Sequence, residues 1–578
     1  MGEGDMGEKT LYAVNVAEAY LALLAERGVA YLFGNAGTDF APIVEAFADA
    51  KARALPTPAP VLAAHENLAV SMAHGYAMVS GRVPAVMVHV SVGTANAMCG
   101  LFNAARENVP MLLTAGRTPL TEAGLPGARD AYIHWGQEMY DQAAMLRELV
   151  KWDYELRNGA QLEVVLDRAL ALAATEPRGP VYLSLPREVL AAPLGELRYR
   201  QPSRLAAAAP PAADEGALSE AAAILSAAEN PLIVTTSAGR DPAAVSALAA
   251  LAERAAIPVV QFAPRHLSLP ADHPMQLGFD PSPLIADADV VLAIESDVPW
   301  MPSRAAPPPE AKVVQIGLDP LFGKYPIRGF PSDLAITARA AQALPSLTER
   351  LEGCIGASRI AARRRRIADR RAAQRAALLR LEEDVRGARP IHPAWLSRCI
   401  GEMKGNAIVV NEYTLLPAHC GFTEPATYFG SSAASGLGWG FGAALGARLA
   451  SPERLVIATL GDGAYLFANP VACHHAAALH DLPVLVVVFN NAMWNAVRRA
   501  TLTMYPDGAA AKSNDPAFFR LERLPAFEQV CTAAGGYGER VEDPAALPAA
   551  LARAARVVQS ERRQALLNVI CSVPGGPL

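Results

Sequence analysis

The chain has 578 residues, of which 52% are apolar, and its 51 basic and 57 acidic side chains leave a net charge of −6. This length exceeds what one hydrophobic core supports and indicates three or four domains. The near balance of charges argues against a nucleic acid or an anionic membrane surface as a partner. The longest apolar runs have about eight residues, whereas a membrane-spanning helix needs roughly 20, so no membrane segment is expected.

Cysteine usage and the amino terminus favour a cytoplasmic location. The seven cysteines are scattered and form no C-x-x-C motif, which is typical of reduced thiols. The polar start MGEGDMGEKT does not look like a signal peptide. Cys473, His474 and His475 could suggest a metal site, but neighbouring residues on the Ala-rich helix expected there point in different directions.

Short apolar runs alternate with longer Ala-rich amphipathic stretches along the chain. The runs lack the alternation of a half-exposed strand, which favours parallel strands buried on both faces by helices. The pattern therefore predicts the doubly wound α/β class. The clearest runs occupy residues 85–90, 111–116, 181–186, 231–236, 258–262, 289–294, 312–317, 407–411, 455–460 and 482–489.

Two breaks divide the chain into three predicted domains, at residues 10–195, 216–350 and 390–578. The first break is the Pro/Ala-rich segment 201–216, which is typical of a linker, and the second is the Arg-rich helical segment 358–390. Within it, the run Arg363–Arg366 could be a nucleic-acid or import signal. Because acidic residues follow in the same segment, we favour a solvated connecting helix. The first and third domains have a similar rhythm of helices and strands.

Two predicted strands in the third domain end in polar residues. Residues 455–460 lead into Gly461-Asp462-Gly463, and about 26 residues later a second apolar run ends at Asn490-Asn491. Ligands bind beyond the carboxyl ends of parallel strands, and the glycines let the backbone approach a ligand closely. A carboxylate, an amide oxygen and a loop carbonyl suit Mg²⁺, and the helix expected at 471–480 would favour phosphate. Either ending alone could be a plain turn.

Together, GDGAYLFANPVACHHAAALHDLPVLVVVFNN resembles the motif of thiamine diphosphate-dependent enzymes, in the group of acetolactate synthase, benzoylformate decarboxylase and pyruvate decarboxylase. The resemblance implies three doubly wound domains that bind the aminopyrimidine (PYR), form a Rossmann-like centre and bind the diphosphate (PP). It implies that Mg²⁺ is held by Asp462, Asn491 and the backbone carbonyl of Met493. Cofactor contacts would also come from Gly461, Gly463 and Ala464.

The resemblance extends to the first domain and to residues 430–447. In VLAAHENLAVSMAHGYA, Glu66 matches the family's catalytic glutamate, which contacts N1′ of the aminopyrimidine; alone it could be a helix-start acid favoured by the helix dipole. In GSSAASGLGWGFGAALGA, Leu437 matches the residue that bends the cofactor, and the backbone of Ser435 and Leu437 would bind its ring. The same small residues could instead form a helix packing face.

Three histidines are candidates for moving the substrate's protons. His89, in HVSVGTANAM, resembles a catalytic histidine of benzoylformate decarboxylase, although a structural histidine at a strand end fits too. His419 lies in NEYTLLPAHC, which resembles the substrate-side loop, and His65 adjoins Glu66 as in acetolactate synthases. Further expected pocket residues are Thr38, Trp494, Val497 and Ala500.

These matches predict a Mg²⁺-dependent carboligase that decarboxylates a 2-oxo acid, similar to acetolactate synthase. A non-oxidative decarboxylase similar to benzoylformate decarboxylase and a non-catalytic cofactor-binding homologue are the alternatives. LGFDPSP at 277–283 departs from the FAD-binding stretch of acetolactate synthase, which argues against FAD, and the missing glycine fingerprint argues against an NAD-dependent dehydrogenase. The family implies at least a homodimer, and tetramers are common in it.

Overall fold

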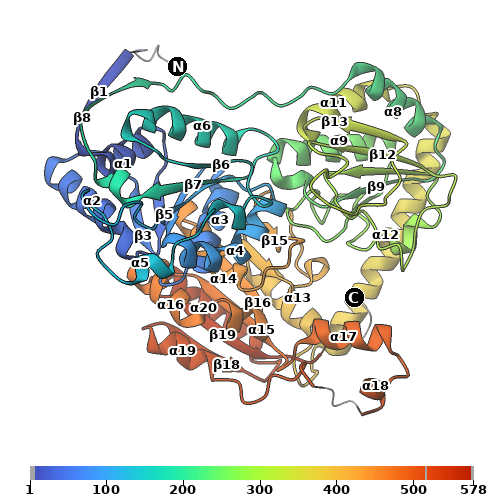
Figure 1. Ribbon diagram of the computed structural model, residues 1–578. Helices are drawn as coiled ribbons and strands as arrows, with labels where there is room; N and C mark the ends of the chain where they lie inside the picture. The colour runs from blue at the N-terminus through green and yellow to red at the C-terminus, as the bar shows by residue number, and fades with distance from the viewer. Residues whose placement is uncertain (1–6, 514–516, 574–578) are drawn as a thin grey trace.

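The computed structural model describes residues 7–513 and 517–573, which form three parallel sheets, each covered by helices (Figure 1). The sheet in the amino-terminal part has the strand order β3-β2-β4-β5-β7-β6. Its strands are β2 Tyr31–Gly34, β3 Ala59–Leu62, β4 Ala85–Val88, β5 Met111–Arg117, β6 Asp153–Glu155 and β7 Pro180–Pro186. Its helices include α1 Val16–Glu26, α2 Ala41–Arg53, α3 Glu66–Ser80, α4 Val90–Arg106, α5 Ile133–Gly136, α6 Leu162–Ala174 and α7 Arg187–Ala191.

The carboxyl-terminal sheet has the order β15-β14-β16-β17-β19-β18, which repeats the order of the first sheet strand for strand. Its strands are β14 Ile408–Glu412, β15 Tyr428–Gly430, β16 Val456–Gly461, β17 Leu485–Asn490, β18 Tyr537–Val541 and β19 Ala565–Ile570. Its helices are α13 Pro393–Met403, α14 Trp439–Ala450, α15 Asp462–Phe467, α16 Pro470–Leu479, α17 Asn495–Met504, α18 Ala509–Ser513, α19 Phe527–Ala533 and α20 Leu547–Ser560. The similar rhythm of the two sequence halves therefore reflects a shared topology.

The central sheet has the order β10-β9-β11-β12-β13 and lies beside the first sheet at one end of the molecule (Figure 1). Its strands are β9 Pro231–Thr235, β10 Val259–Gln261, β11 Val290–Ile294, β12 Lys312–Gly317 and β13 Leu334–Thr337. Helices α8 Glu215–Ala227, α9 Pro242–Ala255, α10 Ser282–Ile285 and α11 Ala340–Arg350 accompany them. All three sheets are parallel throughout, as the apolar runs predicted.

The elements match the predicted runs closely, with three differences. The run at 85–90 ends as a strand at Val88, because Val90 opens α4 and His89 caps that helix. Strand β8, Pro193–Gln201, pairs antiparallel with β1, Gly7–Asn15, a ribbon that the pattern did not predict. The expected helix at 471–480 is α16, but the short helix α15 separates it from the strand ending at Gly461.

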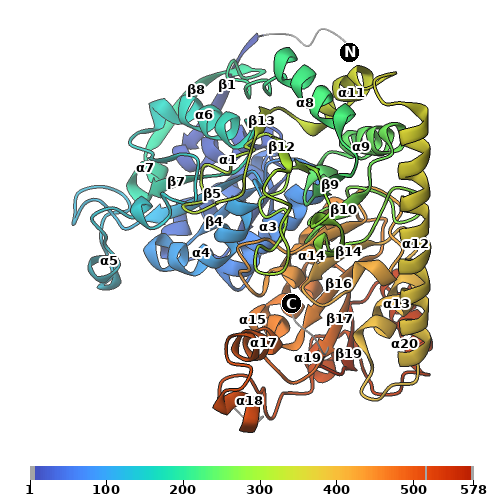
Figure 2. The same cartoon turned by 90° about the vertical axis from the view of Figure 1, so that its right-hand side faces the viewer.

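The Arg-rich segment forms one long helix, α12, Ala357–Val385, which runs down one edge from the central domain to α13 (Figure 2). The prediction of a solvated helix is wrong at Arg363, which is 2% exposed. Its guanidinium donates to the backbone carbonyls of Ala255 and Ala228 in the central domain. Arg363 therefore anchors α12, because ends of neighbouring elements offer it unpaired carbonyl oxygens.

The first and third domains pack through α3 and α14, where glycines permit close contact. A Cβ atom at Gly75 would overlap the carbonyl oxygen of Ala443, and one at Gly446 would overlap that of Met72. The small residues of 430–447 are therefore a helix packing face, as one of the two interpretations held. Among the described helices, none is long and apolar enough to cross a bilayer.

Candidate active site

Glu66 opens α3 at the carboxyl edge of the first sheet and is 7% exposed. Its carboxylate accepts hydrogen bonds from two side-chain amides, from Asn35 Nδ2 at 2.9 Å and from Asn96 Nδ2 at 3.2 Å. Sequence analysis did not single out either asparagine, although both lie in segments it used. His65 caps α3, because its Nδ1 accepts from the backbone N–H of Asn67 at 3.1 Å.

His89 lies beside Glu66, in the turn between β4 and α4. A Cβ atom at Gly93 would stand 3.3 Å from Glu66 Oε1 and 3.4 Å from His89 Cβ, so both side chains border this glycine. Strand order reverses between β2 and β4, and such a switch point is where open α/β sheets bind ligands. The structure thus brings together two of the residues predicted to be catalytic.

Both ring nitrogens of His89 have partners. Nδ1 lies 2.5 Å from Asp39 Oδ1, and Asp39 is 3% exposed. Nε2 lies 3.2 Å from Gln137 Nε2, while the buried Gln137 Oε1 has no hydrogen-bond partner among the described residues. With this amide turned over, Gln137 Oε1 would accept a hydrogen bond from an Nε2–H group, so Gln137 can pair with either tautomer of the ring. Thr38 precedes Asp39 in an exposed turn.

The second group of predicted residues gathers at the ends of β16 and β17. Asp462 is 3% exposed, and its two carboxylate oxygens accept the backbone N–H groups of Gly463 at 2.8 Å and Met493 at 3.3 Å. Burial raises the pKa of this carboxyl above its ordinary value. The carbonyl of Met493 accepts the N–H of Asn495 at 2.9 Å and keeps one lone pair free.

Asn491 supplies the test of whether this corner fits a cation. Within the part of the chain that the structure describes, its buried Oδ1 has no hydrogen-bond partner, which is costly for an amide oxygen unless a bound group contacts it. Asp462, Asn491 and Met493 offer a carboxylate, an amide and a carbonyl oxygen, the hard donors that Mg²⁺ prefers. The corner therefore fits a divalent cation together with the diphosphate it would bind.

Trp494 packs its indole ring on the G-D-G turn. A Cβ atom at Gly463 would overlap Cζ3 of that ring and lie 2.7 Å from both Cε3 and Cη2, so Gly463 makes room for Trp494. Phe467 meets the same ring edge to face, at 5.6 Å between centroids. Val497 and Ala500 follow on α17 and are exposed, so their place in a pocket stays a prediction.

The loop before α14 is held by Glu412, a residue that sequence analysis missed. Its carboxylate accepts the N–H groups of Gly438 at 2.8 Å and Gly440 at 2.7 Å, directly after Leu437. Burial raises the pKa of Glu412 to about 7, because the backbone bonds only partly replace lost water. Ser435 adopts a positive φ of 56°, and the loop is partly exposed. The sequence could have pointed to Glu412, because this acid ends a buried strand, as Asn490 does.

His419 does not join this cluster. It is 6% exposed, and its Nδ1 lies 2.7 Å from Glu382 of α12. Its surroundings are a cavity lined by residues of α12, α13 and the central domain. His474 is also buried, between the hydroxyl of Tyr465 at 2.8 Å and Gln564 Oε1 at 2.6 Å. Both rings have packing partners, which explains their burial.

Two switch points thus carry complementary chemistry. One presents a buried glutamate with a nearby histidine, and the other presents oxygen donors suited to a metal diphosphate. This combination defines a class of enzyme that binds a diphosphate cofactor between two α/β domains. Models of the thiamine pyrophosphate enzymes match here: the N-terminal TPP binding domain at 14–145, the central domain at 218–347 and the C-terminal TPP binding domain at 412–569. The chain belongs to this family and is a thiamine diphosphate-dependent enzyme.

The names of the relatives cover several reactions. The chain is 29% identical to a probable 2-ketoarginine decarboxylase of Pseudomonas aeruginosa, covering 89% of this chain and 88% of the relative. It is 29% identical to benzoylformate decarboxylase of the same species (84% and 87% covered) and 26% identical to sulfoacetaldehyde acetyltransferase of Alcaligenes xylosoxydans (97% and 94%). The structure of benzoylformate decarboxylase from Polynucleobacter necessarius superposes with a TM-score of 0.77 at 20% identity, covering 98% and 100% of the two chains, which supports the fold.

Proposed function

We propose that the enzyme decarboxylates a 2-oxo acid and that His89 delivers the proton that completes the product. The contact of His89 with Asp39 beside Glu66 carries this proposal. When bound, thiamine diphosphate supplies the electron sink that lets a 2-oxo acid lose CO₂. Asp39 fixes the orientation of the His89 ring through Nδ1, which leaves Nε2 to hold and release a proton.

The other side chains bind and orient. We assign Glu66 to the aminopyrimidine, where the amides of Asn35 and Asn96 keep its carboxylate directed. Asp462, Asn491 and Met493 would hold Mg²⁺, and Leu437 would bend the cofactor over the loop that Glu412 braces. We also propose that Gly461, Gly463 and Ala464 lie against the diphosphate. Thr38, His65, Trp494, Val497 and Ala500 stay predicted pocket residues.

This proposal reverses the order of the two reactions considered from sequence. A proton donor beside the reacting carbon favours release of an aldehyde, whereas a carboligase must withhold that proton until an acceptor arrives. Carboligation remains the second candidate, because the relatives include a sulfoacetaldehyde acetyltransferase and an acetolactate synthase of Escherichia coli. His419 was a third candidate acid, and its pairing with Glu382 favours a packing role.

Product analysis separates the two reactions. The protein with Mg²⁺ and thiamine diphosphate is incubated with pyruvate or benzoylformate, with and without an acceptor aldehyde, and CO₂ and products are measured. Aldehyde alone supports decarboxylation, and a hydroxy-ketone supports carboligation. His89→Gln should lower aldehyde formation by about 10²-fold or more, and His419→Gln, the matched control, should leave it within about twofold. Equal losses in both variants would contradict the assignment of His89.

We further propose that the active site forms between two copies of the chain, with a homotetramer as the predicted assembly. The hydrogen-bond partners of Glu66 lie in its own domain, and α17 exposes apolar side chains such as Val497 and Met504, which are 46% and 69% exposed. Mixing Glu66→Gln with Asp462→Asn subunits tests this. Sites shared between copies would recover about one quarter of the activity, because half of the dimers carry one intact site. No recovery would place each site within one chain. A cytoplasmic location also stays a prediction.

A further inference from the structure

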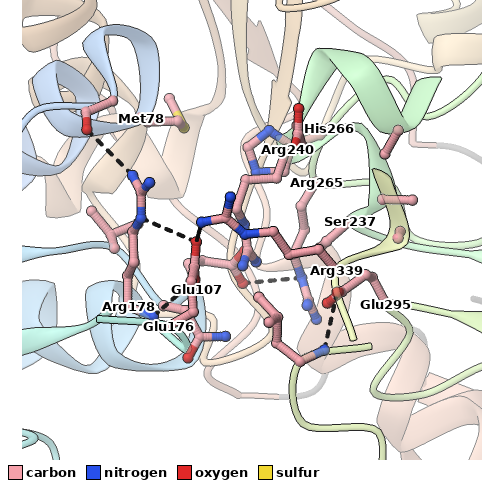
Figure 3. A pocket seen from close by; sticks show the side chains of 18 of the residues that line it. Met78, Glu107, Glu176, Arg178, Ser237, Arg240, Arg265, His266, Glu295 and Arg339 are labelled. Carbon is pink, nitrogen blue, oxygen red and sulfur yellow. Dashed lines mark hydrogen bonds and ion pairs between the residues drawn. The ribbon is translucent and has the colours of Figure 1, made fainter. Parts of the chain in front are cut away.

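A cavity of about 310 Å³ lies between the first and central domains, away from the residues assigned above (Figure 3). It opens at the carboxyl ends of β9 and β11, between which the strand order of the central sheet reverses. That reversal makes it the third switch point of the molecule. The other two carry Glu66 and Asp462, whereas the proposed reaction leaves this one unused.

Two of the four acids that line the cavity, Glu107 and Glu176, are paired with arginines. Arg265 contacts Glu107 at 3.0 Å and Asp297 at 2.5 Å. Glu176 faces both Arg339 at 3.0 Å and Arg178 at 3.2 Å. Two of these pairs, Arg265 with Glu107 and Arg339 with Glu176, join the two domains. A ligand would therefore meet the groups that remain.

Hydrogen-bond donors dominate those remaining groups. Arg240 lines the cavity, and within the described part of the chain its guanidinium has no ion pair or hydrogen bond. Ser237 is 4% exposed, and its hydroxyl has no hydrogen-bond partner within residues 7–513 and 517–573. Helix α11 begins here at Ala340 without a side-chain cap, so its first N–H groups also face the cavity.

Acceptors at the cavity are the carboxyl groups of Asp241 and Glu295, of which Glu295 is the more deeply buried. Glu295 follows β11 with a positive φ of 46°, a conformation that is uncommon for a residue with a side chain, and its Oε1 accepts the N–H of Leu318 at 3.2 Å. Desolvation raises the pKa of this carboxyl above its ordinary value. A carboxyl in this state suits a hydroxyl group of a ligand, which can both donate and accept a hydrogen bond.

We propose that the cavity binds a small hydroxylated phosphate ester, with its phosphate on Arg240, Ser237 and the start of α11 and its hydroxyl on Glu295. A guanidinium, a hydroxyl and a helix amino terminus together match the several acceptor oxygens of phosphate. The volume is at the lower end of the roughly 300–1,000 Å³ typical of ligand sites, which suits a small metabolite and excludes a dinucleotide.

Occupancy would act on the active site through α3. Glu66 opens this helix, and Ala77 and Met78 near its other end line the cavity. A ligand that bridges the domains would hold α3 against the central sheet. The bound ester would therefore bias the position of Glu66 and serve as a regulator of the enzyme.

Calorimetry with glycerol 3-phosphate tests the site, on the full-length enzyme in phosphate-free buffer of constant ionic strength. The wild type should bind it saturably and more tightly than inorganic phosphate, which lacks the hydroxyl. Arg240→Met and Ser237→Ala should each weaken binding about tenfold or more. Arg254→Met, on the exposed far end of α9, is the matched control and should bind as the wild type does.

Three results would overturn the proposal. They are no saturable binding to the wild type, equal affinity in all four proteins, or malonate binding more tightly than glycerol 3-phosphate. The titration is made with and without thiamine diphosphate and Mg²⁺. Its outcome is independent of the proposed reaction, because it follows heat of binding and requires no turnover.

Discussion

Gly463→Ala should weaken cofactor binding by wedging Trp494 away from the G-D-G turn. The added Cβ would overlap Cζ3 of the indole ring and lie 2.7 Å from two further ring carbons, whereas carbon atoms in contact sit about 3.5–4.0 Å apart, so the ring must retreat by more than about 1 Å. Trp494 directly follows Met493, whose N–H bonds Asp462 Oδ2 at 3.3 Å. The retreat therefore pulls the proposed metal loop away from Asp462.

Overpacking of this kind costs about 1–3 kcal/mol. If the cost falls on the loop that binds the cofactor, the dissociation constant of thiamine diphosphate should rise about 5- to 150-fold. Calorimetric titration of thiamine diphosphate at saturating Mg²⁺ measures it. The expected loss of affinity comes from the clash with the ring of Trp494, and a substitution at Trp494 removes that ring.

A double-mutant cycle isolates the ring. In a Trp494→Ala background the space beside residue 463 is open, so Gly463→Ala should there change the affinity by less than about twofold. An equal loss in both backgrounds would refute the reasoning, as would an unchanged affinity in the Gly463→Ala single variant. Melting curves without cofactor show whether each variant folds.

Three further perturbations test other parts of the structure. Glu66→Gln should slow deuterium exchange at C2 of bound thiamine diphosphate, followed by NMR, by about 10²–10⁴-fold with affinity nearly unchanged; normal exchange would remove Glu66 from its proposed role. Glu412 has a pKa of about 7 in the folded protein, against an ordinary value of 4.5. As the pH rises from about 4.5 to about 7, this carboxyl ionises first in the unfolded chain, so the free energy of unfolding falls by about 3 kcal/mol. The contribution of Glu412 to stability is therefore largest below about pH 4.5. Glu412→Gln should therefore narrow the difference between urea midpoints at about pH 5 and about pH 8, and an unaltered difference would contradict the burial argument. Arg363→Met should lower the free energy of unfolding by about 2–5 kcal/mol, because it leaves two backbone carbonyls unpaired. Arg365→Met, at an exposed position, should change it by less than about 0.5 kcal/mol. Equal urea midpoints for the two variants would show that Arg363 is not buried as described.

The elements that sequence predicted well depend on local patterns. Continuous apolar runs became the buried strands, because only helices on both faces of a sheet satisfy such runs. The polar residues after β16 and β17 came together because parallel neighbours end at the same edge. Glu66 was placed at a helix start in the same way. These inferences needed only the periodicity of each segment and the geometry of a parallel sheet.

The partners of the site residues could not be predicted in this way. Asn35 and Asn96 meet on one carboxylate although 61 residues separate them along the chain, and Asp39 reaches His89 from another strand end. Arg363 looked like its exposed neighbours until packing buried it. Each of these contacts depends on the distance between two elements, which no local pattern encodes.

The chain by itself determined the doubly wound strands, the family motif and the residues at strand ends. Tertiary structure alone decided which polar groups lost water and whether a partner in the described chain replaced it, as it did for Glu412 but not for Asn491 Oδ1 or the Ser237 hydroxyl. It also separated Gly461 from Gly463, which are equivalent in the motif but differ in whether an indole ring lies against them. The physical reason is that hydrophobic periodicity is a property of one segment, whereas burial, hydrogen bonding and packing are properties of the space between segments.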